Sequence, residues 1–217
     1  MSGIARVSPF QRIEIAIFYL VLLVGTALIC WESRLYFLPN MIHGFMLERL
    51  ELAVEDWWRY ALLTHVAGGL VCLVSSLLQY SGLLLKRATW LHRNLGRIYA
   101  LSIITVVFPT GVALAFVAKG GLSGTIGFLT LSFATLFTLL LGMIAIYRKN
   151  LRSHQIWISR SFALVTSAIT FRALQLGLIR LDLVEYQKIY QISLWASIGI
   201  NLALCEYYLL KTTKKKK

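Results

Sequence analysis

The sequence predicts an all-α membrane protein with six transmembrane helices. Of its 217 residues, 58% are hydrophobic and only 14% are charged, and the mean hydropathy is +0.72. Soluble domains contain about 45–50% apolar and about 25% charged residues. Two further observations support the prediction: the chain contains six long apolar runs, and its basic residues are concentrated between them.

Each apolar run is close to or above the length of about 20 residues that a helix needs to cross a bilayer. Within the runs, only Arg172 and Glu206 are charged. No stretch remains for a separate soluble domain, so we predict one membrane domain over residues 1–217, with a kink at Pro109. The runs are residues 15–31, 60–85, 98–118, 121–147, 161–179 and 189–210.

Lys and Arg are concentrated on one side of the predicted membrane. The two termini and the connections on that side carry 15 of the 22 basic residues. Cytoplasmic loops are enriched in Lys and Arg, so both termini are predicted to face the cytoplasm across an inner membrane. The net charge of +13 is then explained by insertion into the membrane rather than by nucleic-acid binding. These loops and the tail 211–217 are predicted to be attracted to anionic lipids. These basic segments are residues 1–14, 86–97, 148–160 and 211–217.

The longest connection, residues 32–59, is predicted to contain an amphipathic helix that lies on the outer membrane surface. Its apolar residues recur at helical spacing. Its acidic residues fall mostly on the other side, where they form a solvated face or hold a cation. Trp57 and Trp58 would lie at headgroup level. The apolar positions are Met46, Leu50, Ala53, Val54 and Trp57.

His92 and His154 are the strongest candidates for a cofactor site. They lie at matched depth near the cytoplasmic ends of the third and fifth helices. If helices 2–5 form a four-helix bundle, these helices are diagonal partners, and the two imidazoles could bind one haem iron from opposite sides. Arg97 and Arg160 would then hold anionic groups such as the propionates. Alternatively, both are interfacial histidines that contact backbone, headgroups or acidic side chains.

Other polar side chains in the apolar runs form two predicted clusters. An Arg within a bilayer is costly, so Arg172 is either part of a functional site or satisfied by backbone carbonyls. Its partner could be a polar neighbour such as Gln175 or Asn201, a loop acid such as Glu55 or Asp56, or a bound anion. Glu206 lies at the depth of Arg160, which predicts an ion pair, with a proton relay as the alternative. The inner cluster is His92, His154, Arg97, Arg160, Glu206 and Gln79, and the outer cluster is His65, Arg172, Gln175 and Asn201.

No motif in the chain identifies a reaction. HExxH, Walker, nucleophile-elbow and GxGxxG motifs are all absent from the sequence. Cys30, Cys72 and Cys205 lie inside apolar runs, which predicts reduced thiols rather than a disulfide framework.

Four segments carry a resemblance to a known family: THVAGG at 64–69, LHRNLGRIY at 91–99, HQIWISRS at 154–161 and NLALCE at 201–206. They resemble an uncharacterised bacterial membrane family, domain of unknown function 2306, over roughly residues 60–208. Gln79 and Arg172 match a Gln and an Arg of that family, whereas Leu77-Leu78 replaces its Gly-Pro. The resemblance implies a prokaryotic inner-membrane protein and no known reaction. A weaker similarity is to two-haem b-type cytochromes, which use four ligands. Because the fourth helix has no histidine, it implies at most one bis-histidine haem.

Three functional hypotheses follow from these residues. The leading one is a redox membrane component that binds haem b or a quinone through His92, His154, Arg97 and Arg160. The second is a transporter, or a lipid- or anion-binding protein, that uses Arg172 and His65. The third is a non-catalytic assembly or scaffold subunit of a larger membrane complex.

Overall fold

The computed structural model consists of helices, with no strand, in the residues that it describes, which are 9–38, 44–79, 87–182 and 184–214. Six helical segments are long and apolar enough to cross a membrane, which confirms the predicted number. The end of the second apolar run (80–85) and the last residues of the tail (215–217) lie outside the described residues. The elements are α1 (Pro9–Ser33), η1 (Arg34–Phe37), η2 (Gly44–Arg49), α2 (Leu50–Ala53), α3 (Asp56–Gln79), α5 (Thr89–Ser102), η3 (Ile103–Val107), α6 (Phe108–Ala115), α7 (Gly121–Tyr147), α8 (Leu151–Leu181) and α9 (Tyr186–Lys214).

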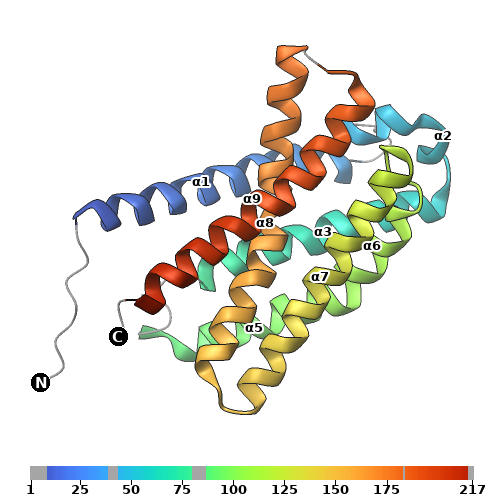
Figure 1. Ribbon diagram of the computed structural model, residues 1–217. Coiled ribbons are helices and arrows are strands. Elements are labelled where there is room, and N and C mark those ends of the chain that lie inside the picture. The colour runs from blue at the N-terminus through green and yellow to red at the C-terminus, as the bar shows by residue number, and fades with distance from the viewer. Residues whose placement is uncertain (1–8, 39–43, 80–86, 183, 215–217) are drawn as a thin grey trace, which may run out of the picture.

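The start of α1 and the end of α9 lie at the same end of the molecule (Figure 1). There, Lys211 Nζ of α9 is 2.6 Å from Glu14 Oε2 of α1. The α7–α8 connection lies at this end too, whereas α2 and the α8–α9 connection lie at the opposite one (Figure 1). We name them the inner end and the outer end after the predicted orientation, which itself stays a prediction.

Two of the predicted basic connections are largely helical. α5 begins at Thr89 and α8 at Leu151, so both start about ten residues before the apolar runs that predicted them. Asn150 caps α8: its side-chain oxygen accepts a hydrogen bond of 3.0 Å from the Ser153 N–H. His92 and His154 are therefore helical residues, and their side-chain directions are set by helix geometry.

α8 packs against α1, α3, α7 and α9. α3 packs along the three segments α5, η3 and α6, and of these η3 and α6 pack against α7. α9 packs along α8 as extensively as α7 does. A bundle made of α3, α5–α6, α7 and α8 is therefore not separate from α9. The predicted four-helix bundle therefore stays a prediction.

Glycines on α7 allow its neighbours to approach closely. A Cβ atom added at Gly127 would lie 2.5 Å from Leu194 of α9, and one at Gly142 would lie 2.6 Å from Ile158 of α8. Lipid provides no hydrophobic driving force between helices, so their association depends on close van der Waals packing of this kind.

The third transmembrane helix contains a π-helical turn, η3, between α5 and α6. Pro109 follows the turn as the second residue of α6. A proline has no N–H to donate, so the carbonyl of Thr105 loses its usual donor and the ladder rearranges locally. The sequence predicted a kink at Pro109, and the structure has a π-helical turn directly before α6 there. Val106 of the turn packs against α3 at Gly68, where an added Cβ would lie 2.8 Å from Val106 Cγ1.

The prediction of one amphipathic surface helix within residues 32–59 is wrong. The segment forms the short helices η1, η2 and α2, and α3 begins at Asp56. Arg49, with φ −140° and ψ 52°, interrupts the helix between η2 and α2. Met46 and Ala53 are buried with Trp58 in one core cluster, because η2 and α2 pack onto α3. Leu50, Val54 and Trp57 of the predicted apolar face are exposed.

We expect Trp58→Ala to lower the free energy of unfolding by about 3–5 kcal/mol, because Trp58 is only 1% exposed and fills that cluster. The neighbouring Trp57 is 50% exposed, so Trp57→Ala should cost at most about 1 kcal/mol. Unfolding measured by steric trapping in bicelles compares the two variants. Equal losses would show that η2 and α2 do not pack on α3 as described.

The predicted orientation can be measured by cysteine labelling. Lys149 lies after α7 at the inner end, and Lys188 lies in α9 at the outer end; both are exposed. In a background without the native cysteines, a membrane-impermeant maleimide should label Lys188→Cys on intact cells, and Lys149→Cys only after lysis. Labelling in the reverse pattern would show that the orientation is opposite to the predicted one.

Candidate functional site

α5 and α8 meet inside the molecule through a hydrogen bond between Tyr99 Oη and Ser161 Oγ. The two oxygens are 2.8 Å apart, and both side chains are buried. His92 precedes Tyr99 by seven residues, and His154 precedes Ser161 by seven. Seven residues make about two helical turns, so each histidine is on the same helix face as its partner in this contact. The faces that carry His92 and His154 therefore look toward one another, about 10 Å nearer the inner end.

The His154 ring is held by α7. Its Nδ1 atom lies 2.8 Å from the carbonyl oxygen of Gly142. A carbonyl only accepts, so this geometry assigns the proton to Nδ1 and leaves a free lone pair on Nε2. His154 can thus act as a ligand or acceptor through Nε2 without losing its contact to α7.

The His92 ring lacks such a bond. Its Nδ1 atom is buried and has no hydrogen-bond partner among the described residues. Gln79 of α3 donates to the His92 carbonyl at 3.3 Å. Gly96 makes room for this amide, since a Cβ there would lie 2.9 Å from Gln79 Nε2. The structure thus brings His92, His154 and Gln79 of the inner cluster together at one end.

The three charged members of the inner cluster form other contacts. The ion pair expected between Arg160 and Glu206 is confirmed: Nε–Oε1 is 2.6 Å, and a second guanidinium nitrogen lies 3.2 Å from Oε2. Arg160 also lies over the Trp157 ring, 4.5 Å from its centroid. Arg97 is exposed and donates to Asn94 of its own helix at 3.2 Å.

The structure does not bring the predicted outer cluster together. Arg172 donates to Gln175 Oε1 at 3.0 Å, which confirms one of its expected partners. His65 instead contacts α6, where its Nδ1 atom is 3.0 Å from Thr110 Oγ1. Asn201 bonds only α8 in the described part of the chain: Oδ1 accepts from Thr170, and Nδ2 donates to the Ala163 carbonyl and to Thr166.

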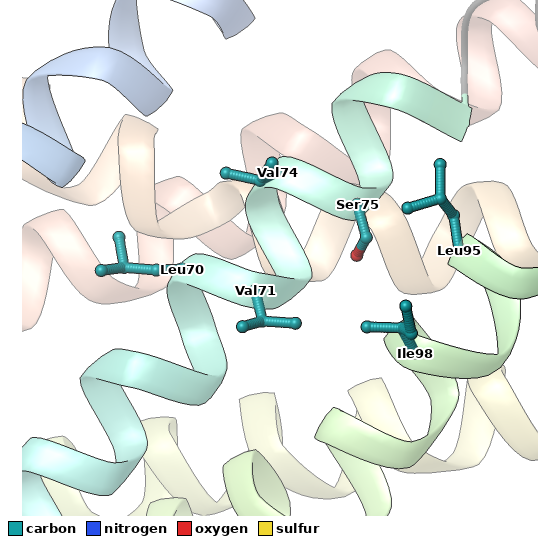
Figure 2. Close-up of a pocket in the computed structure, with 6 residues that line it drawn as sticks. All are labelled: Leu70, Val71, Val74, Ser75, Leu95 and Ile98. Atoms are coloured by element: carbon teal, nitrogen blue, oxygen red, sulfur yellow. The ribbon is translucent and has the colours of Figure 1, made fainter. Parts of the chain in front are cut away.

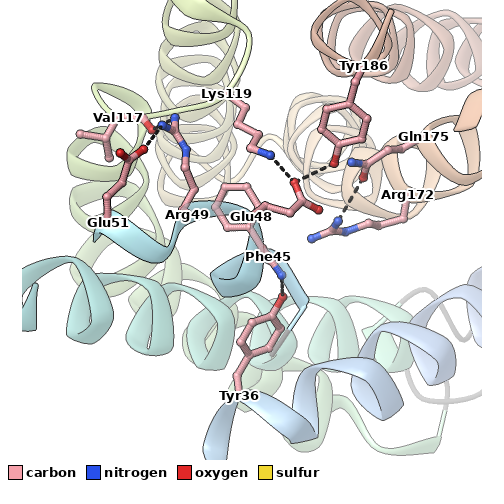
Figure 3. A network of polar contacts seen from close by, with 10 residues as sticks. All are labelled: Tyr36, Phe45, Glu48, Arg49, Glu51, Val117, Lys119, Arg172, Gln175 and Tyr186. Carbon is pink, nitrogen blue, oxygen red and sulfur yellow. Dashed lines mark hydrogen bonds and ion pairs between the residues drawn. The ribbon is translucent and has the colours of Figure 1, made fainter. Parts of the chain in front are cut away.

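Of the two acids drawn in Figure 3, Glu48 of η2 is the one that lies beside Arg172, and it is not one of the loop acids named as possible partners. Glu48 Oε2 accepts from Lys119 Nζ at 2.6 Å and from the Tyr186 hydroxyl at 2.7 Å. The sequence analysis missed this network because its members lie on three separate connections and no motif links them.

The same network borders a pocket of about 850 Å³ at the outer end. Three segments form it: η2–α2, the α6–α7 connection and the start of α9. Its charged lining residues are Glu48, Arg49, Glu51 and Lys119.

A second, smaller pocket of about 320 Å³ lies between α3 and α5 (Figure 2). It is lined by Leu70, Val71, Val74, Ser75, Leu95 and Ile98. The Ser75 hydroxyl donates to the Cys72 carbonyl of its own helix. The pocket therefore presents hydrocarbon and offers little that could recognise a polar group.

Among the described residues, no group of three or more His, Cys, Asp or Glu side chains converges on a point where a metal ion could be held. Sites with three or four protein ligands, as zinc requires, are therefore not formed by them. A centre with two protein ligands, such as a haem iron, is a separate case.

Comparison with known proteins gives one match. A family model described as "Predicted membrane protein (DUF2306)" matches residues 62–209. No curated protein and no solved structure matches the chain. The matched range begins inside α3 and ends inside α9, so it includes both histidine-bearing helices.

A double-mutant cycle should show that Arg160 and Glu206 couple α8 to α9. Both side chains are partly exposed, so we expect a coupling energy of only about 0.5–1 kcal/mol. Unfolding free energies of Arg160→Gln, Glu206→Gln and the double variant give this value. Additive losses would mean that the two residues stabilise the protein independently.

Proposed function

This chain belongs to that family of membrane proteins, and from this premise we propose that it is a haem b-binding electron-transfer component of a cytoplasmic membrane, with His92 and His154 as the axial ligands. One observation carries the proposal: the Tyr99–Ser161 bond turns the two histidine-bearing faces toward one another. Without this contact, matched depth on two helices would say nothing about where the side chains point.

The chemistry of the two rings supports the proposal. Metal-binding histidines usually donate their second ring N–H to a carbonyl or carboxylate. His154 has this arrangement, with Gly142 as the acceptor. The His92 Nδ1 atom is buried and, among the residues that the structure describes, has no hydrogen-bond partner, which costs free energy unless a partner is supplied. An iron atom between the rings would engage both imidazoles.

The core cluster beside Tyr99 contains Cys72, Ile103 and Leu139, so the protein interior next to the proposed site is apolar. A bound haem supplies one-electron transfer, and burial and axial ligands set its potential. The role of this chain is to hold and orient it.

The two arginines fit the proposal unequally. Arg97 is exposed and bonded to its own helix, so it can turn toward a propionate at little cost. Arg160 would first have to leave Glu206, with which it forms two contacts. We therefore assign the propionate role to Arg97, and we assign Arg160 to the α8–α9 junction.

The alternatives differ in their support. A quinone could accept hydrogen bonds at the same imidazoles, and it would give no haem absorbance. The transporter or anion-binding hypothesis loses its shared cavity, because His65 contacts Thr110 while Arg172 contacts Gln175. The scaffold hypothesis predicts that the protein co-purifies with a larger complex.

The test is an absorbance spectrum of protein purified from haem-replete cells and reduced with dithionite. We expect a Soret band and a sharp α-band from a low-spin, bis-histidine haem. His92→Ala and His154→Ala should each lose the α-band. His65→Gln is the matched control, because its ring contacts α6 at Thr110, and it should keep the spectrum.

Two results would contradict the haem proposal. One is the absence of both bands from wild-type protein, also after haemin is added to the purified protein. The other is an unchanged spectrum in both alanine variants, which would place any haem elsewhere.

A further inference from the structure

The outer pocket has more hydrogen-bond donors than acceptors. Arg49 is the clearest case: its side chain is only 22% exposed, and its Nε atom is buried without a hydrogen-bond partner among the described residues. One terminal nitrogen donates to the Val117 carbonyl at 2.5 Å, and the other lies 3.9 Å from Glu51, beyond hydrogen-bond length. A buried, unpaired guanidinium N–H favours a ligand that accepts hydrogen bonds.

Lys119 adds donors on the other side of the pocket. It has three N–H groups, of which Glu48 accepts one, and its side chain is 20% exposed. Lys119 also lies 4.8 Å from the centre of the Tyr186 ring, which limits its movement. The two acids of the pocket leave N–H groups of Arg49 and Lys119 available to a ligand. Glu48 is already bonded to Lys119 and Tyr186, and Glu51 is largely exposed.

The backbone contributes further donors at the same place. Gly120 and Gly121 have φ angles of 92° and 57°, a conformation that favours glycine, and α7 begins there. The first N–H groups of a helix have no acceptor within it. Gly121, the first residue of α7, lies at the pocket lining, with the positive end of a 27-residue helix.

The position of the pocket indicates where its ligand comes from. The lining residues belong to η2–α2, to the connection after the third span, and to the starts of the fourth and sixth spans. The pocket therefore lies where the spans end, at the depth of lipid headgroups. Leu52, Phe116 and Val117 add an apolar side to it, and Phe116 is exposed.

We propose that this pocket binds a phosphate-type anion between Arg49 and Lys119, in the form of the headgroup of an anionic phospholipid whose chains run along Phe116. The cavity of about 850 Å³ lies within the usual range for small-molecule sites, about 300–1,000 Å³. This site is at the opposite end of the molecule from His92 and His154, so the proposal can be tested independently of the haem proposal.

Ligand binding can be measured as thermal stabilisation of the full chain in a neutral maltoside detergent. Three probes separate the sources of the anion: dihexanoyl phosphatidylglycerol, dihexanoyl phosphatidylcholine and inorganic phosphate. We expect saturable stabilisation by phosphatidylglycerol and at least tenfold weaker binding of the zwitterionic lipid. Stabilisation by inorganic phosphate of the same magnitude would retain the anion site and remove its lipid specificity.

Variants test the assigned residues. Arg49→Lys keeps the charge but lacks the guanidinium fork, and Lys119→Gln removes a charge; each should weaken phosphatidylglycerol binding about tenfold. Lys188→Gln is the control, because this exposed lysine is at the same end of the molecule and does not line the pocket. Glu48→Gln should tighten binding, since it removes an anion that competes for Lys119.

The Glu48→Gln variant separates a binding role from general damage, because it predicts a gain of affinity. The proposal is overturned if neither anion stabilises the protein, if Lys188→Gln weakens binding as much as the two pocket variants, or if Glu48→Gln binds phosphatidylglycerol no more tightly than wild type.

Discussion

Inside a bilayer no water is available to the polypeptide, so every backbone N–H and C=O must find its partner within the protein. The spanning helices meet this requirement with their own ladders. Most buried hydroxyls also turn back to their own helix, as Thr135 and Thr166 do by donating to carbonyls four residues earlier. Other side-chain bonds cross between helices. The two that matter most for the site are Tyr99 to Ser161 and His154 to Gly142, and they determine how α5, α7 and α8 are rotated about their axes.

The two ends of the molecule concentrate opposite kinds of unsatisfied polar group. At the inner end, the His154 ring bonds the Gly142 carbonyl through Nδ1, and the His92 Nδ1 atom has no hydrogen-bond partner within the described part of the chain; these are the two rings of the proposed haem site. At the outer end, Arg49 and Lys119 offer N–H donors, so this end suits an anion. Between the two ends, the Asn201 side chain is hydrogen-bonded to Ala163 and Thr166 of α8. The two proposed sites are therefore chemically independent.

Depth along a helix could be predicted from the sequence, because each residue adds a constant rise. That arithmetic placed Arg160 level with Glu206, and the two do pair. It also placed His92 and His154 at matched depth. It failed for Arg172 and His65, which were grouped by depth although their helices present them to different neighbours. Depth is a local quantity, whereas the direction in which a side chain points depends on how each helix is rotated when it packs.

The sequence by itself determined the number of spans, because hydropathy is a property of each segment alone. Only the tertiary structure decided which polar groups come together. Glu48 and Tyr186 are 138 residues apart and share no motif, yet the folding of η2 and α2 onto α3 brings them into contact beside Lys119. The physical reason is that close packing at residues such as Gly127 and Gly142 sets helix rotation, and a one-dimensional pattern does not specify which surfaces pack together.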